Sequence, residues 1–293
     1  MDPEKLKGHF LELIRRASTV LPPDVEAAIA RGAEEEPDDT AAASTLGLLL
    51  ENARQASEGS TPICQDTGAL YFFVEYGPDF APAEIEAAAS AAAADATARY
   101  YLRPNAVDPV TGENSGNNLG LGAPALQLSA RAENGMRVRL LLKGGGSENA
   151  SVQYKLPDSR LGAGRDLEGV RKCVVDAVFA AQGKGCSPGV VGVGIGGNRD
   201  TSYSCAKKQL LRSLDDTNPD PLLTELEERL FAELNELGIG PMGLGGRTTV
   251  LGVKAGKLHR LPACFFVSVS YCCWAARKAF MTIREGEVTY DWD

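Results

Sequence analysis

The spacing of apolar residues changes along this chain, and the change is the strongest constraint on its fold. Over residues 4–20 they recur at the spacing of one helix face, so a helix is expected there. Beyond residue 60 they gather in short runs bounded by glycine, proline or polar residues, which is typical of buried strands. The two patterns alternate without a repeat or a linker, and this predicts one compact unit that mixes helices with β-strands.

Local signals place several element boundaries. Asp24 and Asp166 are positioned to cap helices. The strands over 125–131 and 136–142 are predicted to pair as a hairpin through a turn at 133–135. Further helices are expected over 40–56, 84–101 and 167–182, and further strands over 69–74, 190–195, 248–254 and 265–271.

Composition excludes several classes of function. With 44% apolar and 24% charged residues, the chain can bury a large core, which excludes a disordered protein. A net charge of −9 and only 6% aromatic residues argue against a nucleic-acid surface. No apolar run is long enough to span a membrane, and the first residues lack the apolar core of a secretory signal. We therefore expect a cytoplasmic protein that handles a small molecule.

Seven cysteines and two histidines limit the metal chemistry. Without a secretory signal a disulfide framework is not expected, and two histidines exclude a three-histidine zinc site within this chain. Cys64, Cys186 and Cys273 lie near predicted loops and far apart in sequence, which excludes a ferredoxin-type run. Either they hold a cluster with one iron open to substrate, or they are small buried residues, and their spacing leaves both open.

Other residues suggest acid–base and anion-binding chemistry. Asp66 is the best candidate acid, unless it only shapes the loop before the next strand. Arg103 either clamps a substrate carboxylate or serves as a cation at a helix end. His259 is either a general base or a turn residue. The glycines of 143–147 offer backbone N–H groups to a carboxylate.

The segment 192–197 matches GxGxxG as a string. A dinucleotide fingerprint requires the first glycine to follow a strand, whereas these glycines are expected inside one. Nucleotide binding is therefore disfavoured.

Five segments together resemble the iron–sulfur class I fumarases. They follow the family's order and span most of the chain: PICQDTG (62–68), KGGGSEN (143–149), GCSPGVVGVGIGGN (185–198), GIGPMGLGGRTT (238–249) and CWAAR (273–277). The resemblance is to the N-terminal half of the fused enzymes, or to the alpha subunit of the two-chain form and of tartrate dehydratase. It implies an α+β fold with mixed β-sheets surrounded by helices, as one cluster-binding catalytic domain over 1–293.

The resemblance also implies roles for individual residues. Cys64, Cys186 and Cys273 would ligate a [4Fe–4S] cluster, with Cys272 as the alternative third ligand. The family's cysteine directly precedes Trp-Ala, which favours Cys273. Asp66 would act in proton transfer. The positions that match the family's contacts to a dicarboxylate are Gln65, Asp66, Arg103, Gly145 and Gly146.

The function implied is a hydro-lyase subunit that interconverts malate and fumarate. The alternatives are a tartrate dehydratase alpha subunit and a non-catalytic iron–sulfur sensor or scaffold. The implied partner is a beta subunit in an α₂β₂-like dimer of heterodimers, because further substrate-binding residues belong to the family's other half. One departure concerns His259: many members read His-Arg-His-Pro here, but Leu261 replaces the histidine usually given a role.

Overall fold

The computed structural model describes residues 1–291 and divides into two compact units. Each unit has its own mixed β-sheet and its own hydrophobic core. This α+β architecture confirms the predicted fold class, whereas the single domain over the whole chain stays a prediction. The first unit comprises Met1–Pro23, Glu51–Gly145 and Arg277–Asp293, and the second Asp24–Leu50 and Gly146–Ala276.

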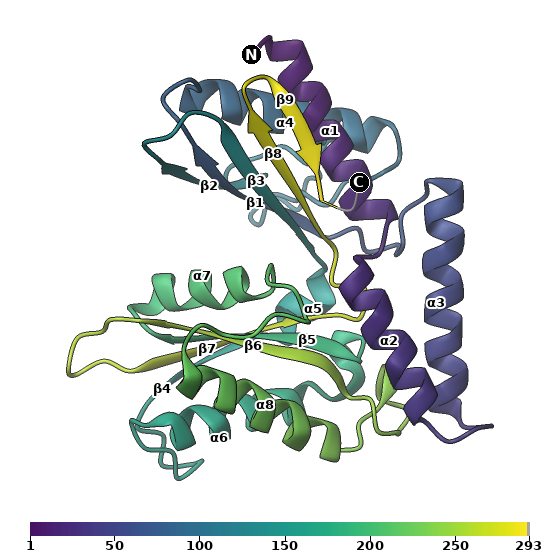
Figure 1. Cartoon of the computed structure of the whole chain (residues 1–293), viewed down its shortest axis with the longest axis vertical. Helices are drawn as coiled ribbons and strands as arrows, with labels where there is room; N and C mark the ends of the chain where they lie inside the picture. Colours follow the sequence, from purple (N-terminus) through teal and green to yellow (C-terminus); the bar gives the residue numbers. More distant parts are fainter. Residues whose placement is uncertain (292–293) are drawn as a thin grey trace. The chain divides into compact units, whose positions relative to one another are not determined.

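The first unit is a five-stranded sheet with helices on one face (Figure 1). Helix α1 (Pro3–Thr19) begins where Asp2 accepts hydrogen bonds from two backbone N–H groups, and its apolar stripe is buried against the sheet as its spacing predicted. Helix α4 (Pro82–Ala98) packs beside α1 through a face of small alanines. The strand order is β2 (Ala125–Ala130), β1 (Ala69–Tyr76), β3 (Met136–Lys143), β8 (Lys278–Arg284) and β9 (Glu287–Tyr290).

The predicted hairpin between β2 and β3 is wrong. Strand β1 lies between them, pairing in parallel with β2 and antiparallel with β3. The physical reason is burial: β1 buries Leu70, Phe72, Phe73 and Val74, whereas β2 has no fully buried residue and forms an edge. A strand that is apolar on both faces gains most from a place inside the sheet.

Two predicted caps have different outcomes. Asp166 caps α6 (Leu167–Ala181) by accepting a hydrogen bond from the Gly169 N–H at 2.7 Å, which confirms that prediction. Asp24 is not a cap, because α2 (Pro23–Glu35) already begins at Pro23. The Asp24 carboxylate instead accepts a hydrogen bond from the Leu214 N–H at 2.8 Å.

The second unit has three layers (Figure 1). Helix α7 (Arg199–Gln209) covers one face of its sheet, and α6 and α8 (Pro221–Glu236) cover the other. The strand order is β4 (Val152–Lys155), β7 (Phe266–Cys272), β5 (Gly189–Gly196) and β6 (Val250–Leu258).

The two faces of β5 explain the alternating glycines. Val191, Val193 and Ile195 pack into the core shared with α6 and α8. On the other face, a Cβ at Gly192 or Gly194 would overlap backbone oxygens of α7. These glycines therefore lie within a strand, as predicted, and allow a helix to pack closely on it.

Substituting Gly194 by alanine should destabilise the second unit. The added methyl group would meet the Ser202 carbonyl oxygen, and overpacking of this kind typically costs about 1–3 kcal/mol. Thermal unfolding of the variant should show a lowered midpoint. Gly8→Ala is the control, because Gly8 is an exposed helix position with nothing within 4 Å of the added atom. An unchanged midpoint for Gly194→Ala would contradict this packing.

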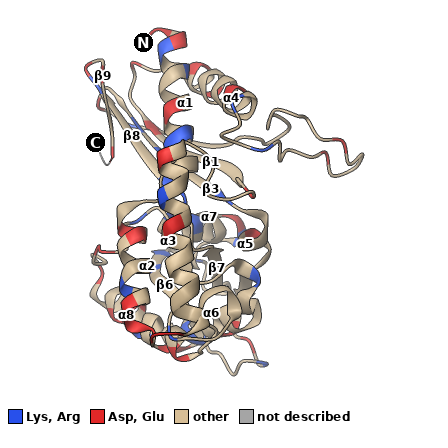
Figure 2. Cartoon of the chain, turned by 90° about the vertical axis from the view of Figure 1, so that its right-hand side faces the viewer, with Lys and Arg blue, Asp and Glu red and all other residues tan. Residues whose placement is uncertain are grey.

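Charged residues of both signs occur along the same helices (Figure 2). In α1, Arg15 and Glu12 approach to 2.7 Å. In α3 (Ala41–Gly59), Arg54 and Glu58 approach to 2.6 Å. Pairs at one helical turn that solvent reaches contribute little stability each.

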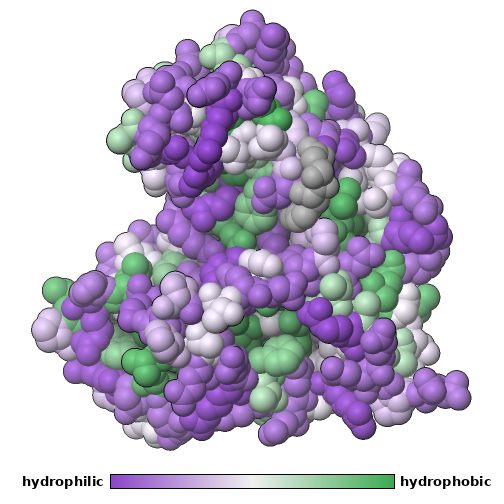
Figure 3. Space-filling model, viewed as in Figure 1, coloured by the Kyte–Doolittle hydropathy of each residue, from purple (hydrophilic) through white to green (hydrophobic). Residues whose placement is uncertain are grey.

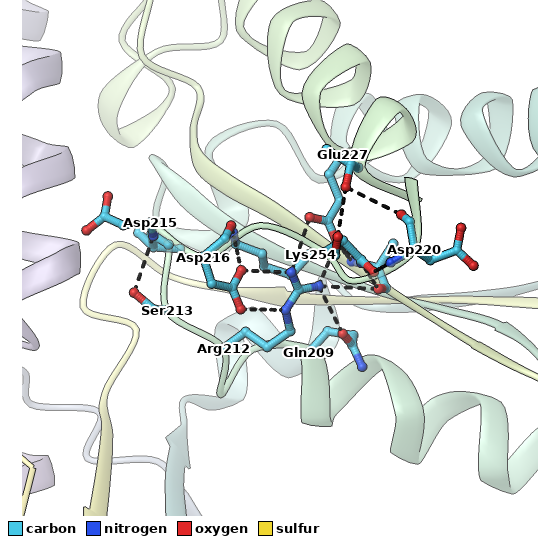
Figure 4. A network of polar contacts seen from close by, with 12 residues as sticks. Gln209, Arg212, Ser213, Asp215, Asp216, Asp220, Glu227 and Lys254 are labelled. Carbon is cyan, nitrogen blue, oxygen red and sulfur yellow. Dashed lines mark hydrogen bonds and ion pairs between the residues drawn. The ribbon is translucent and has the colours of Figure 1, made fainter. Parts of the chain in front are cut away.

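A denser ion-pair network ties together three parts of the second unit (Figure 4). Arg212, after α7, contacts Asp216 at 2.7 Å and Glu227 of α8 at 2.6 Å. Lys254 of β6 contacts Asp216 at 2.7 Å. Burial alone would raise the pKa of Asp216, but hydrogen bonds from Arg212 and Lys254 outweigh it and hold this pKa below its ordinary value.

Candidate active site

In the first unit, the segment before β1 carries three predicted site residues. Cys64 is partly exposed, Gln65 is exposed, and Asp66 is partly exposed. Asp66 Oδ2 accepts a hydrogen bond from the Gly145 N–H at 2.8 Å, and Oδ1 accepts one from the Gly68 N–H at 3.1 Å. The predicted acid and a predicted backbone donor are thus hydrogen-bonded to each other. Asp66 also stabilises its own loop through the Gly68 N–H, so the alternative interpretation, a residue that shapes the loop before β1, fits the same geometry.

Gly144 has to be small at this place. A Cβ added there would lie 2.7 Å from Asp66 Oδ2, so a larger residue would displace the carboxyl group. The glycine run after β3 therefore both contacts Asp66 and leaves room for it.

Arg103 is held beside the same loop. It lies beyond the end of α4 rather than at a helix end, and its backbone N–H donates to Thr67 Oγ1 at 3.0 Å. Its exposed guanidinium donates a long hydrogen bond, 3.4 Å, to the Gln65 carbonyl. Asn105 Nδ2 also donates to Thr67 Oγ1, at 3.0 Å.

Thr67 and Asn105 are positioning residues that sequence reasoning missed. Thr67 is buried and joins the Asp66 loop to the segment after α4. The only sequence signal was its place inside the PICQDTG segment. Asn105 gave none, because its partners lie far away in sequence.

In the second unit, Cys186 and Cys273 lie on adjoining loops. The Trp274 N–H donates to the Cys186 carbonyl at 3.1 Å. Cys186 is exposed and has left-handed backbone geometry, with φ of 57°, whereas Cys273 follows β7 and is partly exposed. Cys272, the alternative ligand, is the last residue of β7 and only 1% exposed.

The remaining cysteines occupy different surroundings. Cys173 in α6 and Cys205 in α7 are buried, and burial raises the pKa of both thiols, that of Cys173 to about 12. A raised pKa disfavours the thiolate that binds metal. Cys264 lies in the loop before β7 and is partly exposed.

The cysteine side chains are soft-metal donors by their chemistry. None of the seven cysteines forms a disulfide. Within residues 1–291, neither unit by itself gathers three Cys, His, Asp or Glu side chains as a metal site. In the second unit Cys186 and Cys273 lie on adjoining loops, and in the first unit Cys64 lies two residues before Asp66; each is an accessible thiol of the kind that binds soft metals.

Two other features lie apart from these residues. His259 is exposed after β6. A cavity of about 730 Å³ opens between α2, α8 and β6, and the network of Figure 4 contributes Asp216, Glu227 and Lys254 to its lining. No predicted site residue lines this cavity.

The chain is similar to known proteins along most of its length. Residues 8–282 match the family model described as fumarate hydratase (Fumerase). The chain belongs to the class I fumarate hydratase and tartrate dehydratase alpha-subunit family. This family was predicted from the sequence, and the match confirms it.

Relatives within this family differ in length and in name. The chain is 49% identical over 278 residues to the "Putative fumarate hydratase class I" of Geobacillus stearothermophilus, covering 94% of this chain and 54% of that protein. It is 34% identical to the "Putative L(+)-tartrate dehydratase subunit alpha" of Methanocaldococcus jannaschii, covering 96% of this chain and 98% of that protein. It is 33% identical to the L(+)-tartrate dehydratase subunit alpha of Escherichia coli K12, covering 83% and 79%. This fumarase family member thus spans about half the length of the Geobacillus protein.

The family member has no helix, within the described residues, that is both long and apolar enough to cross a membrane.

Proposed function

We propose that this chain is the alpha-type part of a hydro-lyase that adds water to fumarate and removes it from malate. Both units together would form one catalytic domain. The observation that carries the proposal is the Asp66 loop, where a candidate acid is fixed next to a candidate thiolate ligand and beside a candidate carboxylate clamp. Adding water to a double bond and removing it again needs a positioned acid–base group and an anchored substrate, and this loop offers candidates for both.

The proposed cofactor is a [4Fe–4S] cluster held by Cys64, Cys186 and Cys273. Support comes from family membership and from the accessibility of these thiols on loops. When bound, such a cluster supplies Lewis-acid chemistry at the iron that no cysteine ligates.

Asp66 is proposed to carry the proton. The Gly145 and Gly68 N–H groups each bond one carboxyl oxygen, so the orientation of the group is fixed before substrate arrives. A positioned carboxyl can protonate the hydroxyl oxygen that leaves malate, and can accept the proton again in the reverse direction.

Arg103 is proposed to hold one carboxylate of the substrate. Its backbone is anchored through Thr67, while its guanidinium is exposed and makes only a long bond to the Gln65 carbonyl. A carboxylate could replace that bond with two parallel charge-assisted ones. Gln65 and the N–H groups of Gly145 and Gly146 complete the proposed contacts to the dicarboxylate.

We propose fumarate and malate, and not tartrate, as the substrates. Identity to the protein named as a fumarate hydratase is 49%, against 34% and 33% for the two proteins named as tartrate dehydratase alpha subunits. Anaerobic reconstitution with iron and sulfide, followed by assays on malate and on tartrate, tests the choice. Turnover of tartrate alone would favour the second candidate, and a cluster without turnover in any assembly would favour a sensor or scaffold.

A beta subunit is the proposed partner, in a dimer of heterodimers. Two of the relatives are named as alpha subunits.

Most of the surface in Figure 3 is hydrophilic, with small clusters of hydrophobic residues. The segment around Arg103 is different, because Tyr100 is 84% exposed, Val110 91% and Leu121 fully exposed. Exposed apolar side chains gathered within one segment of the chain are typical of a docking surface.

The isolated chain should therefore load a cluster but turn over malate poorly. Holding both ends of a dicarboxylate takes several convergent cations or N–H groups, and we expect a beta subunit to supply the rest. Malate dehydration should be measured on cluster-loaded chain with and without that subunit. Val110→Ser and Leu121→Ser should weaken co-purification, whereas Leu222→Ser, at an exposed apolar position on α8, should not. Native-like turnover by the chain alone would contradict the proposal.

A further inference from the structure

Tyr271 fills a space beneath the Cys186 loop. It is 1% exposed and lies near the end of β7, in the second unit. A Cβ added to Gly185 or to Gly189 would overlap its aromatic ring. The two glycines that flank the Cys186 segment thus leave the room that this ring occupies, and the ring in turn supports the segment.

The support matters because Cys186 has an unfavourable backbone conformation. A non-glycine residue with φ of 57° persists only where surrounding structure holds it. The ring contacts at Gly185 and Gly189, together with the hydrogen bond from the Trp274 N–H to the Cys186 carbonyl, provide that support.

The hydroxyl of Tyr271 is a second, independent observation. It is buried and has no hydrogen-bond partner within the described part of the chain. Buried hydroxyl groups are almost always paired, so an unpaired one indicates a missing acceptor. A Cβ added to Gly189 would overlap the hydroxyl oxygen, so the hydroxyl lies beside the segment that follows Cys186. The missing acceptor is therefore expected on the side of the cysteine loops.

We propose that Tyr271 positions the Cys186 loop with its ring and donates its hydroxyl hydrogen to a sulfur atom of the bound iron–sulfur cluster. The inference rests on the proposed function, since it requires the cluster there. Hydrogen bonds to cluster sulfurs stabilise the more negative reduced state and so raise the reduction potential. Tyr271 would then influence both the geometry of a ligand and the electronic state of the cluster.

The hydroxyl is tested with Tyr271→Phe, which keeps the ring. After anaerobic reconstitution, iron and sulfide content should match the wild type, and the midpoint potential followed by electron paramagnetic resonance should shift to a more negative value. Tyr154→Phe is the matched control, because the Tyr154 hydroxyl already donates to Asp176 at 2.7 Å. Its potential should equal that of the wild type.

The role of the ring in supporting the Cys186 loop is tested with two variants. Tyr271→Leu removes the ring, and Gly189→Ala adds a methyl group that would overlap it. Both should lower the iron and sulfide bound per chain, while circular dichroism confirms that the chain still folds. An unchanged potential in Tyr271→Phe, in a chain whose wild type carries the cluster, would overturn this inference alone. A wild-type chain that binds no cluster under any reconstitution would overturn the proposed function and this inference with it.

Discussion

Serine at position 64, 186 or 273 is expected to abolish the visible absorption of the reconstituted cluster. The serine hydroxyl loses its proton far less readily than a cysteine thiol, and its oxygen is a harder donor than sulfur. Iron in such clusters is held by thiolates. All three cysteines have accessible positions on loops. Absorption after anaerobic reconstitution, with iron and sulfide analysis, measures the loss.

The other cysteines serve as controls for this result. Cys173→Ser and Cys205→Ser change buried thiols in helices and should leave the absorption intact. Cys264→Ser is the sharper control, because Cys264 is partly exposed on a loop like the proposed ligands. Cys272→Ser should also keep the cluster. If Cys272→Ser lost the cluster and Cys273→Ser kept it, Cys272 would be the third ligand in place of Cys273.

Asp66→Asn is expected to lower kcat for malate by about 10²- to 10⁴-fold, the range typical of general acid–base residues. The amide oxygen can still accept one of the two hydrogen bonds from the Gly145 and Gly68 N–H groups, while the amide NH2 group cannot accept the other. It cannot deliver a proton as a carboxyl group does. Cluster content, measured on the same sample, should stay at the wild-type level.

Asp79→Asn is the matched control for Asp66. Asp79 also belongs to the first unit, and its carboxylate also accepts a backbone hydrogen bond, from the Gly135 N–H at 2.9 Å. It has no proposed role in the reaction, so its kcat should remain near that of the wild type. A near-native kcat for Asp66→Asn would remove Asp66 from the mechanism.

The sequence predicted those parts of the fold that local patterns control. The apolar stripe of α1, the cap at Asp166 and the strand that became β5 were predicted because spacing and end signals lie within each segment. The pairing of β2 with β3 failed because strand order depends on which strand is apolar on both faces. That property belongs to β1, which lies far from the turn at 133–135.

The candidate site was predictable only in part, for a similar reason. Motif segments identified Asp66 and Gly145, and the structure brings those two together. Thr67 and Asn105 act by hydrogen bonds between segments distant in sequence, and no local pattern reports such contacts. The strand predicted over 265–271 is observed over Phe266–Cys272, so its type was predictable from the local pattern and its ends only to within one residue.

The left-handed backbone at Cys186 has an evolutionary consequence. For most side chains this conformation costs roughly 1–2 kcal/mol, whereas glycine adopts it freely. Selection for folding stability alone would therefore replace Cys186 by glycine, and only selection for the sulfur atom opposes that change. A descendant that had lost the chemistry could gain stability through a single substitution at this position. Glycine here, with the surrounding CSPG segment otherwise intact, would mark such a lineage more directly than the loss of any surface residue.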